Sequence, residues 1–397
     1  MTPETAPARI LLVTRNLPPL VGGMERLNWH IGDELSQHAD VWIIGPKGAS
    51  IQSPQRVKIT EVPLRPLWLF LLASAWQALR IAHKWRPNIV LAGSGLTAPA
   101  ALAAARTTNA RASVYLHGLD AAVRHPTYRA IWNPAIRKMD TVIANSHPTA
   151  ELARNLGVKD SDIRIVHPGV QIPASPQSTD ALQKFREHHG LGGGRLLLSI
   201  GRLTTRKGLR EFVQHALPGI ISSAPDVTLV VIGDAPTDSL HAGIQTRASI
   251  QAAADAAGVG QHIRFLGVIT DPSELACAYE SATLHVFPVR SIPADPEGFG
   301  MVAIEAAAHG LPTAAFATGG VVDAVNIGQS GSLAPPGDYS ALRDEIVKVL
   351  TQKKDDWKKE CQSFAKDFAW PIFGSKLLEA MGPFRRNVPQ KNRGGHD

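Results

Sequence analysis

The chain has 397 residues, of which 44% are hydrophobic, and this is enough for two domains that each bury a core. Its net charge of +7 does not indicate a nucleic-acid-binding protein, because no predicted helix gathers Lys and Arg on one face. The two cysteines exclude a disulfide framework. With no signal-peptide pattern and no apolar run of roughly 18 residues, the sequence predicts a cytoplasmic protein without a membrane span.

The first part of the chain, residues 1–172, alternates short apolar strands with helical segments. Continuous apolar strands separated by helices indicate a parallel sheet that is covered on both faces. We therefore predict an N-terminal domain of the doubly wound, Rossmann-like type. Its strands are expected at residues 10–13, 41–44, 89–91, 113–116, 141–143 and 163–166.

One helical segment of this domain has an unusual composition. It begins near Leu67, is apolar as far as Ala73, and carries Arg80, Lys84 and Arg86 in its later turns. Two interpretations stay open. The segment is either a core helix that ends in solvent or a helix that lies in the interface of an anionic membrane.

A stretch rich in Pro, Ser and Gln predicts a linker at residues 173–190. A second alternating series follows at residues 191–368, so the predicted fold class is α/β, with two Rossmann-like domains that face a cleft. A helix at 369–382 that returns to the first domain and a disordered basic tail at 383–397 are expected to complete the chain. The strands of the second domain are expected at residues 196–200, 227–232, 263–266, 284–287 and 313–316.

Two loops of the N-terminal domain contain candidate ligand-binding residues. Gly22 and Gly23 precede a helix, where backbone N–H groups can meet an anion; a tight turn without a ligand is the structural alternative. His117 follows another strand and can donate to a sugar hydroxyl or move a proton. A buried histidine with a purely structural role is the alternative for His117.

The loop Gly201–Gly208 follows the first strand of the second domain and carries three cations. Arg202 and Lys207 can both reach two phosphates at the carboxyl end of that strand, and Arg206 is expected to face solvent. The structural alternative is a solvated basic loop.

Glu297 and Glu305 flank a glycine-rich turn and the start of an apolar helix. Gly298 and Gly300 allow backbone N–H groups to approach a ligand, and the helix that begins near Met301 presents a positive dipole end. Glu305 has apolar neighbours, so its carboxylate needs a hydrogen-bond partner. Two carboxylates beside N–H donors suit a ligand with many hydroxyls and a phosphate, such as a nucleotide sugar.

We identify no Asp-x-Asp metal site and no His/Cys cluster with metal-ligand spacing in the sequence. A diphosphate therefore needs Arg202, Lys207 and helix N-termini to neutralise its charge. We expect no cofactor and no metal requirement.

In their order along the chain, the candidate segments described above resemble those of the retaining nucleotide-sugar glycosyltransferases of family 4, which have the GT-B fold. The resemblance covers nearly the whole chain and is nearest to the bacterial mannosyltransferases that build phosphatidylinositol mannosides and lipopolysaccharide. The motifs that carry it are Gly22–Arg26, His117 with Gly118, Asn145 with Ser146, His167–Val170, Gly201 with Arg202, Lys207 with Gly208, Glu297 and Glu305.

The resemblance implies a role for each residue of the second domain. Arg202 and Lys207 would bind the donor diphosphate, Glu305 would hold the ribose hydroxyls, and Glu297 would contact the transferred sugar. The other donor-binding residues implied are Phe299, Gly300 and Met301.

In the first domain, the resemblance implies that Gly22 and Gly23 close over the phosphate and that His117 lies near the reacting sugar carbon. Two departures stand out. His167 occupies a position where family members often have asparagine, and the loop 291–296 contains two prolines.

The expected function is transfer of a hexose, with mannose as one candidate, from a nucleoside diphosphate sugar to a hydroxyl of a glycan or lipid-linked acceptor. The expected place is the cytoplasm or, peripherally, the anionic inner face of the membrane. The alternatives are a nucleotide-sugar epimerase on the same fold and a non-catalytic sugar-nucleotide-binding protein.

Overall fold

The structure is a computed structural model that describes residues 7–235, 243–351 and 357–382, so the predicted basic tail lies outside the described residues. The chain forms two compact units. The N-terminal unit comprises the described parts of Met1–Asn145, Ala150–Val166 and Phe373–Asp397. The C-terminal unit comprises those of Ser146–Thr149 and His167–Ile372.

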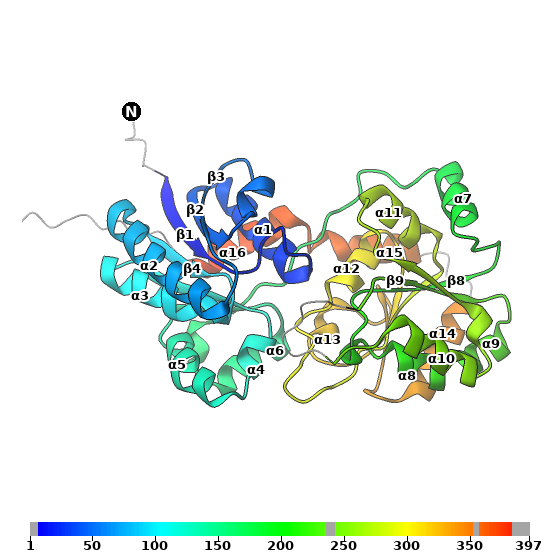
Figure 1. The fold of residues 1–397 in the computed structure, drawn as a ribbon. Helices are drawn as coiled ribbons and strands as arrows, with labels where there is room; N and C mark the ends of the chain where they lie inside the picture. The colour runs from blue at the N-terminus through cyan, green and yellow to red at the C-terminus, as the bar shows by residue number, and fades with distance from the viewer. Residues whose placement is uncertain (1–6, 236–242, 352–356, 383–397) are drawn as a thin grey trace, which may run out of the picture. The chain divides into compact units, whose positions relative to one another are not determined.

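The N-terminal unit contains a seven-stranded parallel sheet in the order β3-β2-β1-β4-β5-β6-β7. Strands β1 to β4 are labelled in Figure 1. Its strands are β1 (Ala8–Val13), β2 (Ala39–Pro46), β3 (Val57–Val62), β4 (Ile89–Ala92), β5 (Arg111–Leu116), β6 (Thr141–Ala144) and β7 (Ile163–Ile165). Its helices are α1 (Gly23–Ser36), α2 (Leu67–Trp85), α3 (Ala98–Thr108), α4 (Leu119–Ala122), α5 (Pro126–Arg137) and most of α6 (His147–Asn155).

Strand β1 shows why this sheet is covered on both faces. Leu11 and Val13 belong to the core cluster that also contains residues of α2 and α3. Ile10 and Leu12 are equally buried, and they point to the opposite face because successive side chains of a strand alternate. Both faces of β1 are therefore apolar, as the uninterrupted hydrophobic run predicts.

The C-terminal unit contains a six-stranded parallel sheet in the order β10-β9-β8-β11-β12-β13. Its strands are β8 (Leu196–Ile200), β9 (Thr228–Ile232), β10 (Ile263–Gly267), β11 (Leu284–Phe287), β12 (Thr313–Phe316) and β13 (Gly331–Ala334). Its helices are α7 (Thr179–His188), α8 (Leu209–His215), α9 (Leu217–Ser223), α10 (Arg247–Ala256), α11 (Pro272–Ser281), α12 (Met301–Ala308), α13 (Val321–Ala324), α14 (Tyr339–Thr351), α15 (Trp357–Lys366) and the start of α16 (Trp370–Met381).

The sheet of the C-terminal unit also separates two cores. Leu197 on β8 packs in a cluster with Phe212 of α8, whereas the next residue, Leu198, packs in a cluster with Tyr279 of α11. The predicted fold class is confirmed: each unit is a doubly wound α/β structure around a parallel sheet. In such sheets, ligands bind beyond the carboxyl ends of the strands.

The stretch predicted as a linker, residues 173–190, contains α7, whose first turn is capped by the Ser178 side chain through the backbone N–H of Ala181. Helix α16 occupies the place of the helix predicted at 369–382. From Phe373 onwards α16 is grouped with the N-terminal unit, where the Phe373 ring lies 6.3 Å from that of Tyr115.

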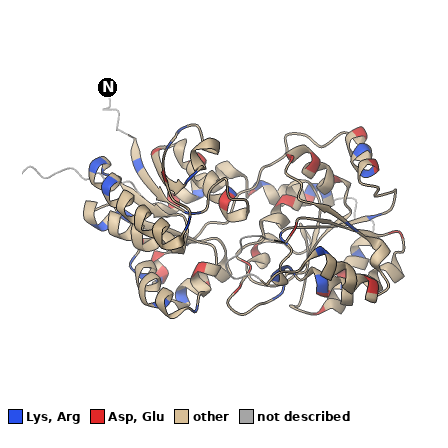
Figure 2. Cartoon of the chain, in the orientation of Figure 1, with Lys and Arg blue, Asp and Glu red and all other residues tan. Residues whose placement is uncertain are grey.

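In both units Lys and Arg are interspersed among Asp and Glu (Figure 2). Among the described residues, no helix combines the length and the hydropathy that a bilayer crossing requires.

Candidate functional site

The basic loop of the C-terminal unit lies at the carboxyl end of β8 and includes the short 3-10 helix η4 (Thr205–Lys207). Gly208 ends this helix with a φ of 69°, and a Cβ atom at that position would overlap the carbonyl oxygen of Pro288. A glycine is therefore needed for the loop to pass so close to the end of β11.

Lys207 and Glu297 form an ion pair within this unit. The Lys207 ammonium donates a hydrogen bond of 2.9 Å to Oε2 of Glu297 and lies 4.5 Å from the centre of the Phe287 ring. The side chains of Lys207 and Glu297 are only 18% and 11% exposed. Two of the predicted site residues, 90 positions apart in the sequence, are thus in direct contact.

The prediction that Arg206 faces solvent is wrong. Its side chain is 13% exposed, and Nη1 donates to the carbonyl oxygen of Pro296 at 2.6 Å. Its guanidinium also lies 3.4 Å from a carboxylate oxygen of Asp295 and 3.5 Å from Oε2 of Glu297. The proline-containing loop before Glu297 supplies the acceptors that hold this arginine.

The charges around Glu297 determine its protonation state. Burial by itself would raise the pKa of Glu297, but Arg206, Lys207 and Arg202 outweigh burial and lower it to about 2. Burial lowers the pKa of Lys207, while Glu297 acts in the opposite direction. Glu297 is consequently ionised at neutral pH, beside three cations.

Arg202 is exposed, unlike its two basic neighbours. Together with Gly201 and Lys207 it lines a small pocket beyond the carboxyl end of β8, whose other walls include Phe287 and Pro288 of the β11 end. The structure therefore brings Arg202 and Lys207 to one pocket, at the sheet edge where doubly wound folds bind ligands.

Glu305 lies on α12, which begins after Gly300, a residue with a φ of 93°. The Glu305 carboxylate is partly buried and accepts a hydrogen bond of 2.9 Å from the Tyr279 hydroxyl. The expected partner for this carboxylate is thus a tyrosine of α11. Phe299 is buried and Met301 is partly buried. The backbone between them runs from Glu297 into the N-terminus of α12.

A second glycine turn supports the segment that carries Glu297. The backbone N–H of Gly320 donates to the carbonyl oxygen of Glu297 at 2.9 Å. A Cβ atom at Gly319 would lie 2.5 Å from the same oxygen. The two backbones can come this close only because residue 319 is a glycine.

The remaining predicted residues lie in the N-terminal unit. Gly22 is the N-cap of α1 and Gly23 its first residue, and Gly22 accepts a backbone hydrogen bond from Arg26. His117 is buried, and its Nε2 lies 2.8 Å from the carbonyl oxygen of Gly93. Because a carbonyl only accepts, Nε2 is the donor in this contact.

Several contributors to the site were not predicted from the sequence. Tyr279 and Phe287 lie inside ordinary apolar stretches, and nothing in the sequence distinguishes them from core residues. One feature of the sequence pointed to the loop 291–296 as a source of acceptors. Its two prolines and Asp295 form an unusual turn directly before Glu297.

Comparison with known proteins places the chain in a family. Residues 21–172 match the family model described as Glycosyltransferase Family 4, and residues 194–352 match the one described as Glycosyl transferases group 1. This chain is a glycosyltransferase of the family-4 type.

Relatives of this glycosyltransferase act on different substrates. It is 28% identical over 366 residues to a GDP-mannose-dependent alpha-(1-6)-phosphatidylinositol monomannoside mannosyltransferase of Mycolicibacterium smegmatis, covering 87% of this chain and 90% of the relative. It is 27% identical over 321 residues to a 2-deoxystreptamine glucosyltransferase of Streptomyces kanamyceticus, covering 74% and 79%.

The crystal structure of Anabaena HepE in complex with UDP resembles the glycosyltransferase with a TM-score of 0.78 at 19% identity, covering 94% of this chain and 99% of that one. The fold is GT-B.

Proposed function

We propose that the glycosyltransferase moves a hexose from a nucleoside diphosphate sugar to a hydroxyl of a glycan or lipid-linked acceptor, with retention at the anomeric carbon. The observation that carries the proposal is the convergence of Arg202 and Lys207 at the end of β8, with Glu297 ion-paired to Lys207. An exposed guanidinium beside a largely buried ammonium can neutralise a diphosphate at this end of the sheet.

The donor-binding roles follow the chemistry of each group. Arg202 and Lys207 bind the diphosphate, and the N-terminus of α12, at Gly300 and Met301, adds N–H donors. Glu297 accepts hydrogen bonds from the hydroxyls of the transferred sugar, and Glu305, oriented by the Tyr279 hydroxyl, accepts those of the ribose. In the N-terminal unit, the roles of Gly22 and Gly23 at the phosphate and of His117 near the reacting sugar carbon remain predictions.

The proposed transfer needs no protein nucleophile. The bond between the sugar C1 and the diphosphate oxygen breaks, the acceptor oxygen bonds to C1 on the same face, and the acceptor proton passes to the departing diphosphate. Glu297 is held by Lys207 and Arg206, which favours a binding role over attack on C1. The cations stabilise the leaving group, and this type of electrostatic stabilisation contributes strongly to enzymatic rates.

We propose that this transfer is independent of metal ions, because Arg202, Lys207 and the N-terminus of α12 supply the positive charge for the diphosphate. The reaction rate should be unchanged in excess EDTA. A rate that falls to background and recovers with Mg²⁺ would overturn this part of the proposal.

The donor can be identified by thermal unfolding in the presence of GDP-, UDP- and ADP-sugars. A donor at 100 times its dissociation constant stabilises the protein by about 2.7 kcal/mol. The stabilising sugar nucleotide is then incubated with and without candidate acceptors. Isomerisation of the donor sugar without an acceptor would indicate an epimerase, and binding without any reaction would indicate a non-catalytic protein.

A lipid-linked acceptor is favoured by helix α2. Phe70, Ala78 and Ile81 are buried on one of its faces. On another face, Trp68, Leu72 and Trp76 are 62%, 64% and 60% exposed at intervals of one turn. The helix is therefore packed against the core and still presents an apolar stripe.

Basic groups flank this stripe. Arg65, Arg80 and Lys84 are exposed, and the Arg80 guanidinium lies 5.4 Å from the centre of the Trp76 ring. Tryptophan beside arginine suits the interface of an anionic bilayer. We propose that α2 docks on such a membrane.

The docking proposal predicts that the protein sediments with anionic phosphatidylglycerol vesicles at low salt. Binding should weaken in high salt and in a Trp68→Ser/Trp76→Ser variant, with Trp29→Ser of helix α1 as the control. Sedimentation equal to that with neutral vesicles would contradict the proposal.

A further inference from the structure

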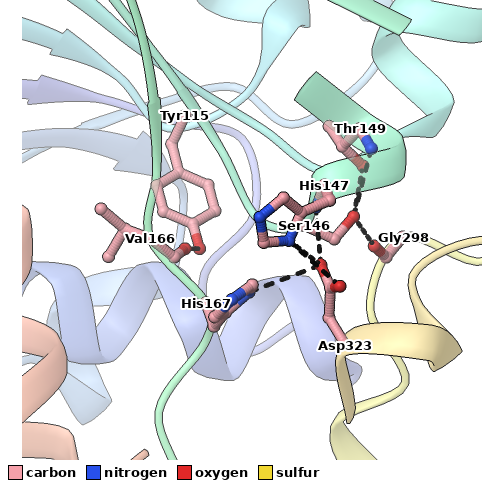
Figure 3. A network of polar contacts seen from close by, with 8 residues as sticks. All are labelled: Tyr115, Ser146, His147, Thr149, Val166, His167, Gly298 and Asp323. Carbon is pink, nitrogen blue, oxygen red and sulfur yellow. Dashed lines mark hydrogen bonds and ion pairs between the residues drawn. The ribbon is translucent and has the colours of Figure 1, made fainter. Parts of the chain in front are cut away.

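Two histidines and one aspartate of the C-terminal unit converge at a point that the proposed transfer chemistry does not use (Figure 3). Nδ1 of His147 lies 3.1 Å from both carboxylate oxygens of Asp323, and Nδ1 of His167 lies 3.9 Å from Oδ2. One possible ligand atom of each residue lies within 4.8 Å of those of the other two.

The three side chains are held in place by their surroundings. The backbone N–H of His147 donates to Oδ2 of Asp323 at 2.6 Å, which fixes the carboxylate. The His167 ring stacks on Phe299, with ring centres 5.3 Å apart. Beside them, the Ser146 hydroxyl donates to the carbonyl oxygen of Gly298 at 2.7 Å (Figure 3).

We propose that His147, His167 and Asp323 bind a zinc ion. Zinc–ligand bonds of about 2.0–2.1 Å in a tetrahedral site place the ligand atoms about 3.4 Å apart, and the spacings of 3.1 and 3.9 Å lie on either side of this value. Imidazole nitrogens with a carboxylate oxygen form a donor set that zinc accepts.

The exposure of the cluster also suits a metal ion. The His147 side chain is 69% exposed, so an ion can enter from solvent and a water molecule can complete its coordination. Asp323, which is 11% exposed, supplies the negative charge. The ring contact between His167 and Phe299 and the hydrogen bond from Ser146 to Gly298 connect the site to the turn between Glu297 and α12.

Among the described residues, one other cluster has three potential ligands: His30, Asp33 and Glu34 on α1. Burial and the nearby positive charge of Arg26 lower the pKa of His30 to about 4. The same arginine would repel a metal ion at that place. This cluster therefore serves as a control rather than as a second proposal.

The test is a titration of the intact protein with Zn²⁺ in competition with a chromophoric chelator, without donor or acceptor. We expect one competing site, and His147→Gln and Asp323→Asn should each weaken zinc binding at least about tenfold, because each removes one of three ligands. The control variants His38→Gln, which removes an exposed histidine, and Asp33→Asn should bind like the parent.

The proposal is overturned if the parent does not compete for zinc, if both ligand variants bind like the parent, or if Asp33→Asn abolishes binding. Circular dichroism of each variant checks that it is folded, and the exposed position of His147 makes His147→Gln the safer substitution. Because the readout is zinc binding alone, its failure leaves the proposed transfer untouched, and the failure of transfer leaves the zinc site untouched.

Discussion

The Lys207 ammonium and the Glu297 carboxylate are joined by a hydrogen bond of 2.9 Å between largely buried groups. This contact connects the basic loop after β8 to the turn before α12. Removing one partner of a buried pair is costly, since the other charge stays without compensation. Loss of either partner alone should therefore destabilise the unit and disturb the pocket at its edge.

The first prediction concerns stability in acid. The pKa of Glu297 is lowered from 4.5 to about 2 in the folded chain. A carboxyl group with a lowered pKa contributes stability above pH 4.5, and this contribution is lost as the pH falls towards 2. It is on the order of 3 kcal/mol at neutral pH.

Urea unfolding at pH 6 and pH 3 measures this contribution. The free energy of unfolding of the parent should exceed that of Glu297→Gln at pH 6, and the difference should shrink strongly at pH 3. Glu187→Gln, which changes an exposed carboxylate, is the control. A difference that is equal at both pH values would refute the assignment.

The second prediction concerns the hydroxyl that orients Glu305. Tyr279→Phe removes a hydrogen bond to a carboxylate, and such bonds contribute about 1.5–3 kcal/mol. If Glu305 binds the donor ribose, the KM for the donor should rise several-fold while kcat changes little, because the ground state and the transition state are affected alike. Steady-state kinetics beside a Tyr339→Phe control test this, and a fall in kcat at constant KM would contradict it.

The third prediction compares two glycines with similar backbone conformations. Gly208 and Gly192 have φ values of 69° and 61°, but an added Cβ would overlap the Pro288 carbonyl at Gly208 and would meet nothing within 4 Å at Gly192. Gly192→Ala should cost about 1 kcal/mol from backbone strain alone. Gly208→Ala should cost several kcal/mol in thermal unfolding and should also reduce donor binding. Equal losses in the two variants would show that the close approach to β11 does not matter.

The central strands could be predicted from the sequence, because strands such as Ile89–Ala92 are buried on both faces and are apolar throughout. Two edge strands were missed for a physical reason. In β3, Lys58, Thr60 and Glu61 are mixed with apolar residues in a partly exposed strand, and β13 begins with Gly331 and Ser332. An edge strand is solvated on one side, so its composition resembles that of a loop.

For the site, charge and glycine spacing singled out Lys207 and Glu297, and the structure brings the two side chains into contact. The same reasoning misplaced Arg206, because its acceptors come from the loop around Asp295 and Pro296, and only the fold brings them close. The cluster of His147, His167 and Asp323 has no local spacing pattern for the same reason.

The central claim is that Arg202 and Lys207 act together on the donor diphosphate, and the kinetics of sugar transfer test it most directly. Arg202→Ala and Lys207→Ala should each lower kcat/KM by about 100-fold or more, the usual size for one electrostatic stabiliser. Arg210→Ala, which removes an exposed arginine of α8 that pairs with Glu211, should transfer sugar like the parent. Parent-like kcat/KM values in both Arg202→Ala and Lys207→Ala would contradict the account.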